Sequence, residues 1–208
     1  QKWGNATPYF EKKHYICRED ENYNNNMDSQ GRVAFQFQSL SYQPVAEGMY
    51  LVFLKETNGN RLFPISLDEK QKSFIEQTIS LRPTEQKKLL ETFRICMGVS
   101  GNILEDVTID NTENGNFTAQ IHFLQNGETF SISSSAPQAI AIALTFHSTL
   151  YVCEDLLSVC RANATQGSVS FPLSSINTDM LKKAMKDAVE REEYELAANL
   201  RDELNKRK

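Results

Sequence analysis

Two patterns of hydrophobic and polar positions divide the chain. From Gly31 onward, short runs alternate between apolar and polar residues, as in strands that bury one face. Residues 49–54 are apolar throughout, which is typical of a strand covered on both faces. Residues 177–208 instead repeat apolar positions every three or four residues, the period of amphipathic helices. The pattern therefore predicts a folded body followed by a helical segment.

The body is predicted to be an α+β domain with a mixed or antiparallel sheet and packed helices. Strands are expected at 33–38, 49–54, 61–66, 104–110, 117–124, 129–133 and 150–152. Helices are expected at 67–79, 84–97, 138–146 and 154–160. In the second of these helices Leu89, Leu90 and Phe93 are expected to face inward. The strand that is apolar on both faces also predicts that the body associates with itself.

The C-terminal segment is predicted to be a helical hairpin with its turn near Glu192. The apolar face of its first helix consists of Met180, Leu181, Ala184, Met185, Ala188 and Val189. In the second helix Leu196, Leu200 and Leu204 form a row that we expect to close against the first helix. A helical pair this small buries little apolar surface, so it usually packs on a partner.

A second row on the last helix is left over by this packing. It consists of Tyr194, Ala197, Ala198 and Arg201. Its small and aromatic side chains suit close approach by another helix, so we expect these residues to bind a protein partner. The alternative is that this row packs on the body of the same chain, because exposed apolar surface is rare unless it is used.

The hairpin resembles the UVR motif, a helical hairpin found in excision-repair subunits and in some protease adaptors. The matching residues are Ala188, Glu192, Glu193, Tyr194, Glu195, Ala197, Ala198, Leu200, Arg201, Asp202, Glu203 and Leu204. The resemblance implies contact between proteins, with another UVR-type hairpin as the expected partner.

Composition narrows the range of functions. The 208 residues carry a formal net charge of −5, so the chain is not expected to coat nucleic acid unspecifically. The four cysteines form no zinc or CxxC spacing and suit a reducing cytoplasm, where we expect the protein to lie. No apolar stretch is long enough to span a bilayer, so no membrane partner is expected.

The domain boundaries follow from changes in composition and in hydrophobic periodicity along the chain. Residues 1–26 are polar and lack periodicity, so we expect a disordered or extraneous leader that ends before Met27. The body is expected at 27–160 and the hairpin at 177–208. Between them, residues 161–176 are rich in Gly, Ser, Thr and Asn and are expected to form a linker.

The body resembles the bifunctional nuclease (BFN) domain. The residues that carry the resemblance are Leu40-Ser41-Tyr42, the hairpin from Tyr50 to Ile65, Arg82-Pro83, 113–117, 139–144 and 150–152. The resemblance implies a nuclease that cleaves DNA and RNA, with a divalent metal such as Mg²⁺ or Mn²⁺ as cofactor. It also implies that nucleic acid is a partner of the body.

The residues that could carry this chemistry are few, and the metal ligands stay unassigned. Phosphodiester hydrolysis needs metal-held carboxylates or a histidine that acts as acid or base. The candidates are Asp68, Glu69, Glu85 and His122. The acids can equally be partners of helix dipoles, and His122 can be a surface residue of its strand.

The chain departs from the family at its charged motifs. The family pattern has His-Asp soon after Arg-Pro, where this chain has Glu85-Gln86, and Asp-Ala-Arg-Pro-Ser-Asp where it has 133–138. Two hypotheses therefore stay open. The chain is a nuclease with an interaction hairpin, or it is a catalytically degenerate scaffold or adaptor that acts through protein contacts.

Overall fold

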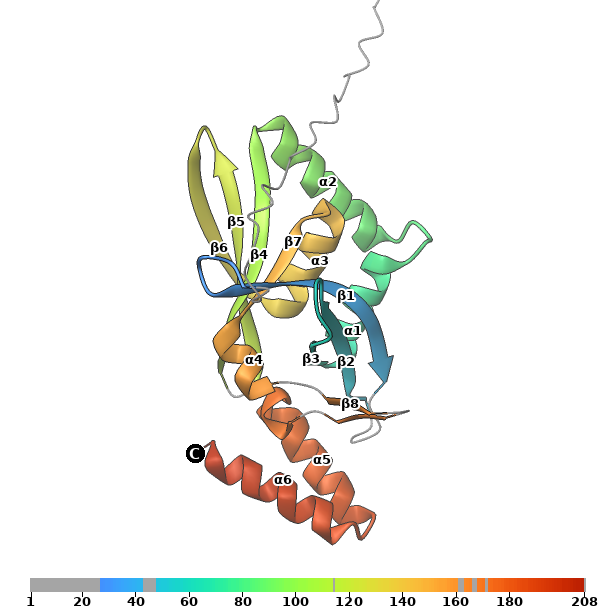
Figure 1. Cartoon of the computed structure of the whole chain (residues 1–208). Coiled ribbons are helices and arrows are strands. Elements are labelled where there is room, and N and C mark those ends of the chain that lie inside the picture. Colours follow the sequence, from blue (N-terminus) through green and yellow to red (C-terminus); the bar gives the residue numbers. More distant parts are fainter. Residues whose placement is uncertain are drawn as a thin grey trace, which may run out of the picture.

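A computed structural model describes residues 27–42, 48–113, 115–160, 163–165, 168–170 and 172–207. The predicted leader, residues 1–26, lies outside the described residues. Within the described part, seven strands form one sheet with helices packed on it, and two further helices form a hairpin near the C-terminus (Figure 1). The predicted α+β class is confirmed.

The sheet is mixed and runs in the order β3-β2-β1-β7-β4-β5-β6. Its strands are β1 (Arg32–Tyr42), β2 (Tyr50–Glu56), β3 (Leu62–Leu67), β4 (Asn102–Glu113), β5 (Asn116–Gln125), β6 (Glu128–Ser135) and β7 (Thr149–Cys153). Only β4 and β7 pair in parallel; the other neighbours in the sheet are antiparallel. Short turns explain this, because β2–β3, β4–β5 and β5–β6 are sequential hairpins.

Three helices cover one face of the sheet (Figure 1). They are α1 (Glu69–Ile79), α2 (Glu85–Val99) and α3 (Ala136–Phe146). As predicted, α3 is buried, and its Ala139, Ile140 and Ala143 join the main core. Alternation along the strands supplies the other side of this core, with Val107 and Ile109 of β4 pointing toward the helices.

Side-chain caps fix the starts of the first two helices. Asp68 caps α1 in a capping box with Gln71, and the Thr84 hydroxyl accepts a hydrogen bond from the Lys87 N–H at the start of α2. The prediction that Leu89 faces inward is wrong, because Leu89 is 69% exposed and α2 contains no buried residue. Helix α2 packs mainly on α1, α3 and β4, and its Leu89, Ile95 and Val99 stay exposed.

The remaining elements lead from the sheet to the hairpin. They are α4 (Glu154–Cys160), the paired strands β8 (Asn163–Thr165) and β9 (Ser168–Ser170), the 3-10 helix η1 (Leu173–Ser175), α5 (Thr178–Glu190) and α6 (Tyr194–Lys206). The hairpin lies at the end of the molecule away from α2 (Figure 1). Among the described residues, no helix combines the length and apolar character needed to cross a bilayer.

Candidate functional site

The base of the hairpin is fixed to the body by buried contacts. Ile176 is fully buried and shares a small core with Met49, the residue before β2. The Asn177 N–H donates a hydrogen bond to Ser66 Oγ on β3, at 3.2 Å. The Asn177 side chain also caps α5, because its Oδ1 accepts from the Met180 N–H at 2.9 Å. The entry angle of α5 is therefore set by the body.

Small residues let the two hairpin helices pack closely. Ala184 and Ala188 of α5 are buried against Ala197 and Leu200 of α6 in the same small core. At the turn, Glu192 takes a left-handed conformation with φ of 62°, and the Glu193 N–H bonds back to the Ala188 carbonyl at 2.9 Å. This is the geometry of a helix C-terminus that closes on itself and reverses the chain.

Arg207 locks the free end of α6 to the start of α5. Its guanidinium donates hydrogen bonds to the carbonyls of Leu173, at 2.8 Å, and Ile176, at 2.7 Å, and reaches Thr178 Oγ1 at 3.3 Å. Glu203 pairs with it at 3.2 Å. The Arg207 side chain is only 10% exposed, so these carbonyls have little access to competing water. The hairpin is thus closed at both ends.

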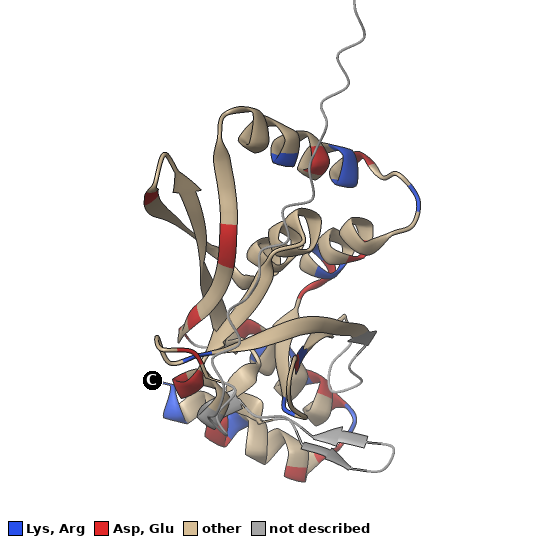
Figure 2. Cartoon of the chain, turned by 45° about the horizontal axis from the view of Figure 1, so that its top comes forward, with Lys and Arg blue, Asp and Glu red and all other residues tan. Residues whose placement is uncertain are grey.

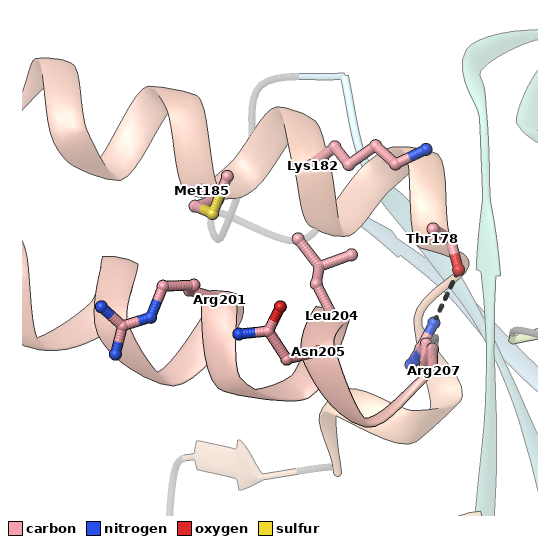
Figure 3. A pocket seen from close by; sticks show the side chains of 7 residues that line it. All are labelled: Thr178, Lys182, Met185, Arg201, Leu204, Asn205 and Arg207. Atoms are coloured by element: carbon pink, nitrogen blue, oxygen red, sulfur yellow. Dashed lines mark hydrogen bonds between the residues drawn. The ribbon is translucent and has the colours of Figure 1, made fainter.

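A groove of about 440 Å³ runs between the two helices near this base. Met185 of α5 and Leu204 of α6 approach each other across its floor (Figure 3). Lys182 and Arg201 line its sides, together with Asn205, Thr178 and Arg207. The groove therefore combines an apolar floor with positively charged and amide side chains around it.

Charge is distributed unevenly along the hairpin, whose two helices carry side chains of both signs (Figure 2). The tip, residues 190–195, contains four glutamates and a single arginine. In residues 178–187 and 201–207, toward the base, basic residues outnumber acidic ones by six to four: Lys182, Lys183, Lys186, Arg201, Lys206 and Arg207. The hairpin thus has an acidic tip and a basic base.

A second polar cluster lies on the face of the sheet that the three helices leave open. Strand pairing aligns Asp106 of β4 with His122 of β5, and His122 with Ser131 of β6. Ser131 Oγ lies 2.7 Å from His122 Nδ1, and His122 Nε2 lies 3.7 Å from Asp106 Oδ1. With Nδ1 unprotonated, the serine hydroxyl donates to the imidazole, an arrangement that favours a polarised hydroxyl.

Arg32 of β1 extends this row. It pairs with Asp106 at 3.2 Å and Asp28 at 2.9 Å and stacks over the Tyr151 ring, with 4.4 Å from the guanidinium carbon to the ring centroid. Burial disfavours the charged guanidinium, but hydrogen bonds and the two carboxylates outweigh it and raise the pKa of Arg32. Burial likewise opposes ionisation of Asp28, yet hydrogen bonds from Arg32 lower the pKa of that carboxyl.

Comparison with family models identifies both parts of the chain. The model of the bifunctional nuclease domain matches residues 52–165, more than half of the 208 residues. The chain belongs to the bifunctional nuclease domain family. The UvrB/uvrC (UVR) motif matches residues 179–207, which span nearly all of α5 and α6. Both resemblances drawn from the sequence are confirmed. No curated protein matches the chain.

The predicted partner-binding residues of the UVR hairpin fall into two groups. Tyr194 is 67% exposed, and Arg201 is exposed at the edge of the groove. Ala198, between them on the same helix face, is half-buried. Ala197 is not on this free face, because it belongs to the core between the helices. Val189, expected on the inner face of α5, is instead 52% exposed near the turn.

The predicted catalytic residues of the BFN domain do not meet. Asp68 and Glu69 lie at the start of α1, where Asp68 serves as the helix cap. Glu85 lies beyond the other end of α1 and pairs with Lys88 at 2.7 Å. His122 is on the opposite face of the sheet from these helices. Among the described residues, no three His, Cys, Asp or Glu side chains are placed to hold a metal ion. These residues therefore do not form the metal site that the family resemblance implies.

Several residues of both sites were missed from the sequence. The Asn126-Gly127 turn fixes the β5–β6 register, so the pairing of Ser131 with His122 could have been predicted from the sequence. Asp106 was not, because a bulge between Leu104 and Asp106 shifts the β4–β5 register by one residue. Arg207 also gave no signal beyond a cation at a helix C-terminus, because the two carbonyls that accept its hydrogen bonds lie more than thirty residues earlier in the chain.

Proposed function

We propose that the protein is an adaptor whose BFN body presents the UVR hairpin to a protein partner. The observation that carries this is the asymmetry of the hairpin. Its base is fixed by Ile176, Asn177 and Arg207, while the groove and Tyr194 stay open to solvent. Because the binding surface is already ordered in the free protein, less conformational entropy is lost when a partner binds. We expect this adaptor to act in the cytoplasm.

The groove favours a partner segment with an apolar anchor flanked by carboxylates. Met185 and Leu204 offer apolar contact, and Lys182 and Arg201 offer charge. Both cations form ion pairs with neighbours on their own helix, Asp179 and Asp202, and all four side chains are mostly exposed. Such surface pairs contribute little stability, so the cations can exchange partners on binding at small cost.

The tip of a second UVR-type hairpin has the required chemistry. In this chain the tip carries the exposed Tyr194 among Glu192, Glu193 and Glu195. An aromatic ring can fill the apolar floor, and the carboxylates can pair with the basic rim. Helix α6 also presents Tyr194, Ala198, Arg201 and Asn205 at spacings of four, three and four, which form one face. Antiparallel pairing of two such faces sets each tip against the other groove.

A binding experiment with the full chain tests the proposal. We expect Tyr194→Ala combined with Arg201→Ala to abolish capture of a partner that carries a UVR-type hairpin, with an unchanged melting temperature. The matched control is Asn199→Ala, because Asn199 is exposed on a different side of α6. Intact capture together with a lowered melting temperature would mean that these residues pack within the chain, contrary to the proposal.

Phosphodiester hydrolysis is the second candidate, favoured by the family and by the Ser131–His122–Asp106 row. In that function His122 accepts a proton from an attacking hydroxyl or water, and Asp106, backed by Arg32, orients the imidazole. Ser131 is exposed, and the side chains of His122 and Asp106 are 24% and 18% exposed. Aspartates outnumber cations there, which weakens phosphate binding.

A nuclease assay separates this candidate from the adaptor. The full chain is incubated with single- and double-stranded DNA and RNA in Mg²⁺ or Mn²⁺. If the row is catalytic, His122→Ala should lose at least about a hundredfold in rate. His147→Asn is the control, because Asn tolerates the left-handed backbone of His147. Cleavage that is unaffected by His122→Ala contradicts a role of the row in hydrolysis.

A further inference from the structure

Helix α2 and the edge strand β6 both lie at the end of the molecule away from the hairpin (Figure 1), and both expose apolar side chains. Leu89 and Phe93 of α2 and Phe130 and Ile132 of β6 are 69%, 37%, 38% and 45% exposed. We call these four residues the edge surface. Apolar side chains that gather in this way on a soluble protein usually mark a contact with another protein.

Aromatic contacts connect the two exposed parts of the edge surface through the core. Phe93 packs on Phe146 at 5.7 Å between ring centroids, and Phe146 packs on Phe123 at 6.3 Å. Phe123 stacks on Phe130 at 5.4 Å. The row leads from α2 across the end of α3 and through the buried Phe123 to β6. The two exposed parts are therefore joined by one row of aromatic rings on the helix side of the sheet.

The edge strand itself is unprotected. Within the described residues, β6 has β5 as its single strand neighbour and is exposed from Glu128 to Ser133. Every second residue of such a strand directs its N–H and C=O away from the sheet. Natural edges are usually blocked by charged residues or proline, but β6 contains no proline, and its one charged residue is Glu128 at the turn (Figure 2).

We propose that β6 pairs with β6 of a second copy of this chain, in antiparallel orientation about a two-fold axis at Ser131. A second copy fits this edge, because the register sets the two apolar residues of β6 against each other and leaves its one charged residue opposite a serine. Phe130 faces Ile132 of the other copy, Thr129 faces Ser133, and Glu128 faces Ser134, so no like charges meet. Both Phe130 and Ile132 lie on the helix side, where α2 of each copy continues the contact.

Mass measurement by light scattering or sedimentation on the full chain tests this interface. We expect a dimer, and we expect Ile132→Lys to weaken it by about a hundredfold or more, because two lysines enter an apolar contact per dimer. Ile95→Lys is the matched control. Ile95 is 57% exposed but lies on the far side of α2 from Phe93, so the dimer should persist. A monomeric wild type, or a dimer that survives Ile132→Lys, overturns the proposal.

A cross-link tests the register independently of stability. Ser131→Cys places two thiols opposite each other at the axis, so mild oxidation should give a disulfide-linked dimer beyond any wild-type background. Ser133→Cys faces Thr129 of the other copy and should not cross-link at a comparable rate. Equal cross-linking of both variants, or none of either, overturns the register. Because both variants lie far from the hairpin, the result does not depend on the partner of the UVR motif.

Discussion

Among single residues, Arg207 holds the base of the hairpin together through its hydrogen bonds. Arg207→Ala removes the donors to the Leu173 and Ile176 carbonyls, and Ile176 is fully buried. Leaving a buried acceptor unpaired costs about 1–3 kcal/mol. We expect the free energy of opening of α6, measured by amide hydrogen exchange, to fall by that amount. The exposed Arg201→Ala should leave it unchanged; equal exchange in both variants would show that Arg207 does not lock the hairpin.

Glu192 is strained by its backbone conformation. A non-glycine residue at φ of 62° carries a steric penalty that glycine avoids, partly offset by the greater flexibility of unfolded glycine. Glu192→Gly should therefore stabilise the hairpin by about 0.5–1 kcal/mol. Glu193→Gly is the control, since Glu193 has φ of −83° and gains nothing from the change. Hydrogen exchange in α5 and α6 of the two variants should move in opposite directions.

The Asp28–Arg32 pair makes the stability of the body depend on pH. The pKa of Asp28 is lower in the folded chain, so its ionised form adds stability above the unfolded pKa, about 3.9. That contribution disappears as pH falls through the folded pKa. Asp28→Asn should thus be less stable than wild type near neutrality, with the two curves converging in acid. Denaturant unfolding across pH 2–7 measures this, and Asp202→Asn, in an exposed pair, should track wild type.

For the larger elements, the joint between body and hairpin depends on Gly115. This residue has φ of +77°, and a Cβ there would lie well under 3.0 Å from the carbonyl of Ile176. Gly115→Ala should therefore push the base of α5 away from the turn between β4 and β5. Faster proteolysis between β7 and α5, with the sheet still folded, is the expected result. Gly98→Ala in α2 meets no atom within 4 Å and should be neutral or stabilising.

Most elements could be predicted because their patterns are local. The strand expected at 117–124 is observed as β5, and its alternation buries Phe117, Ile121 and Phe123 and leaves His122 on the other face. Helix α2 shows the limit of this reasoning. Its period predicted an inward face, yet the structure has no layer to cover Leu89. A helical period reports which side is apolar, and only the tertiary arrangement decides whether something packs there.

The two sites differed in how far the sequence revealed them. The UVR hairpin was recognisable because its motif is contiguous, although Ala197 proved to be core rather than surface. The row of Asp106, His122 and Ser131 joins three strands, and a bulge in β4 sets the register between two of them. The predicted catalytic acids Asp68, Glu69 and Glu85 are spread along the helix side of the sheet. Whether residues far apart in the sequence come together depends on the topology of the fold, and local sequence patterns do not reveal that topology.

For the whole molecule, the two proposed contacts lie at opposite ends. The edge surface of α2 and β6 is remote from the hairpin (Figure 1). A dimer formed through β6 would thus present two UVR hairpins without blocking either. Two linked sites bind a bivalent partner far more tightly than one when the geometry permits both to engage. Breaking the dimer with Ile132→Lys should accordingly weaken capture of a multivalent partner and leave monovalent binding unchanged.

The central claim is that the exposed face of the hairpin holds another protein. A photo-crosslinking amino acid in place of Tyr194, in the full chain in cells, tests it most directly, with Asn199 as the control position. We predict cross-links from position 194, identified by mass spectrometry, to the groove of a UVR-type hairpin on a partner, and few from position 199. Cross-links from position 194 that fall solely within its own BFN domain would contradict the account.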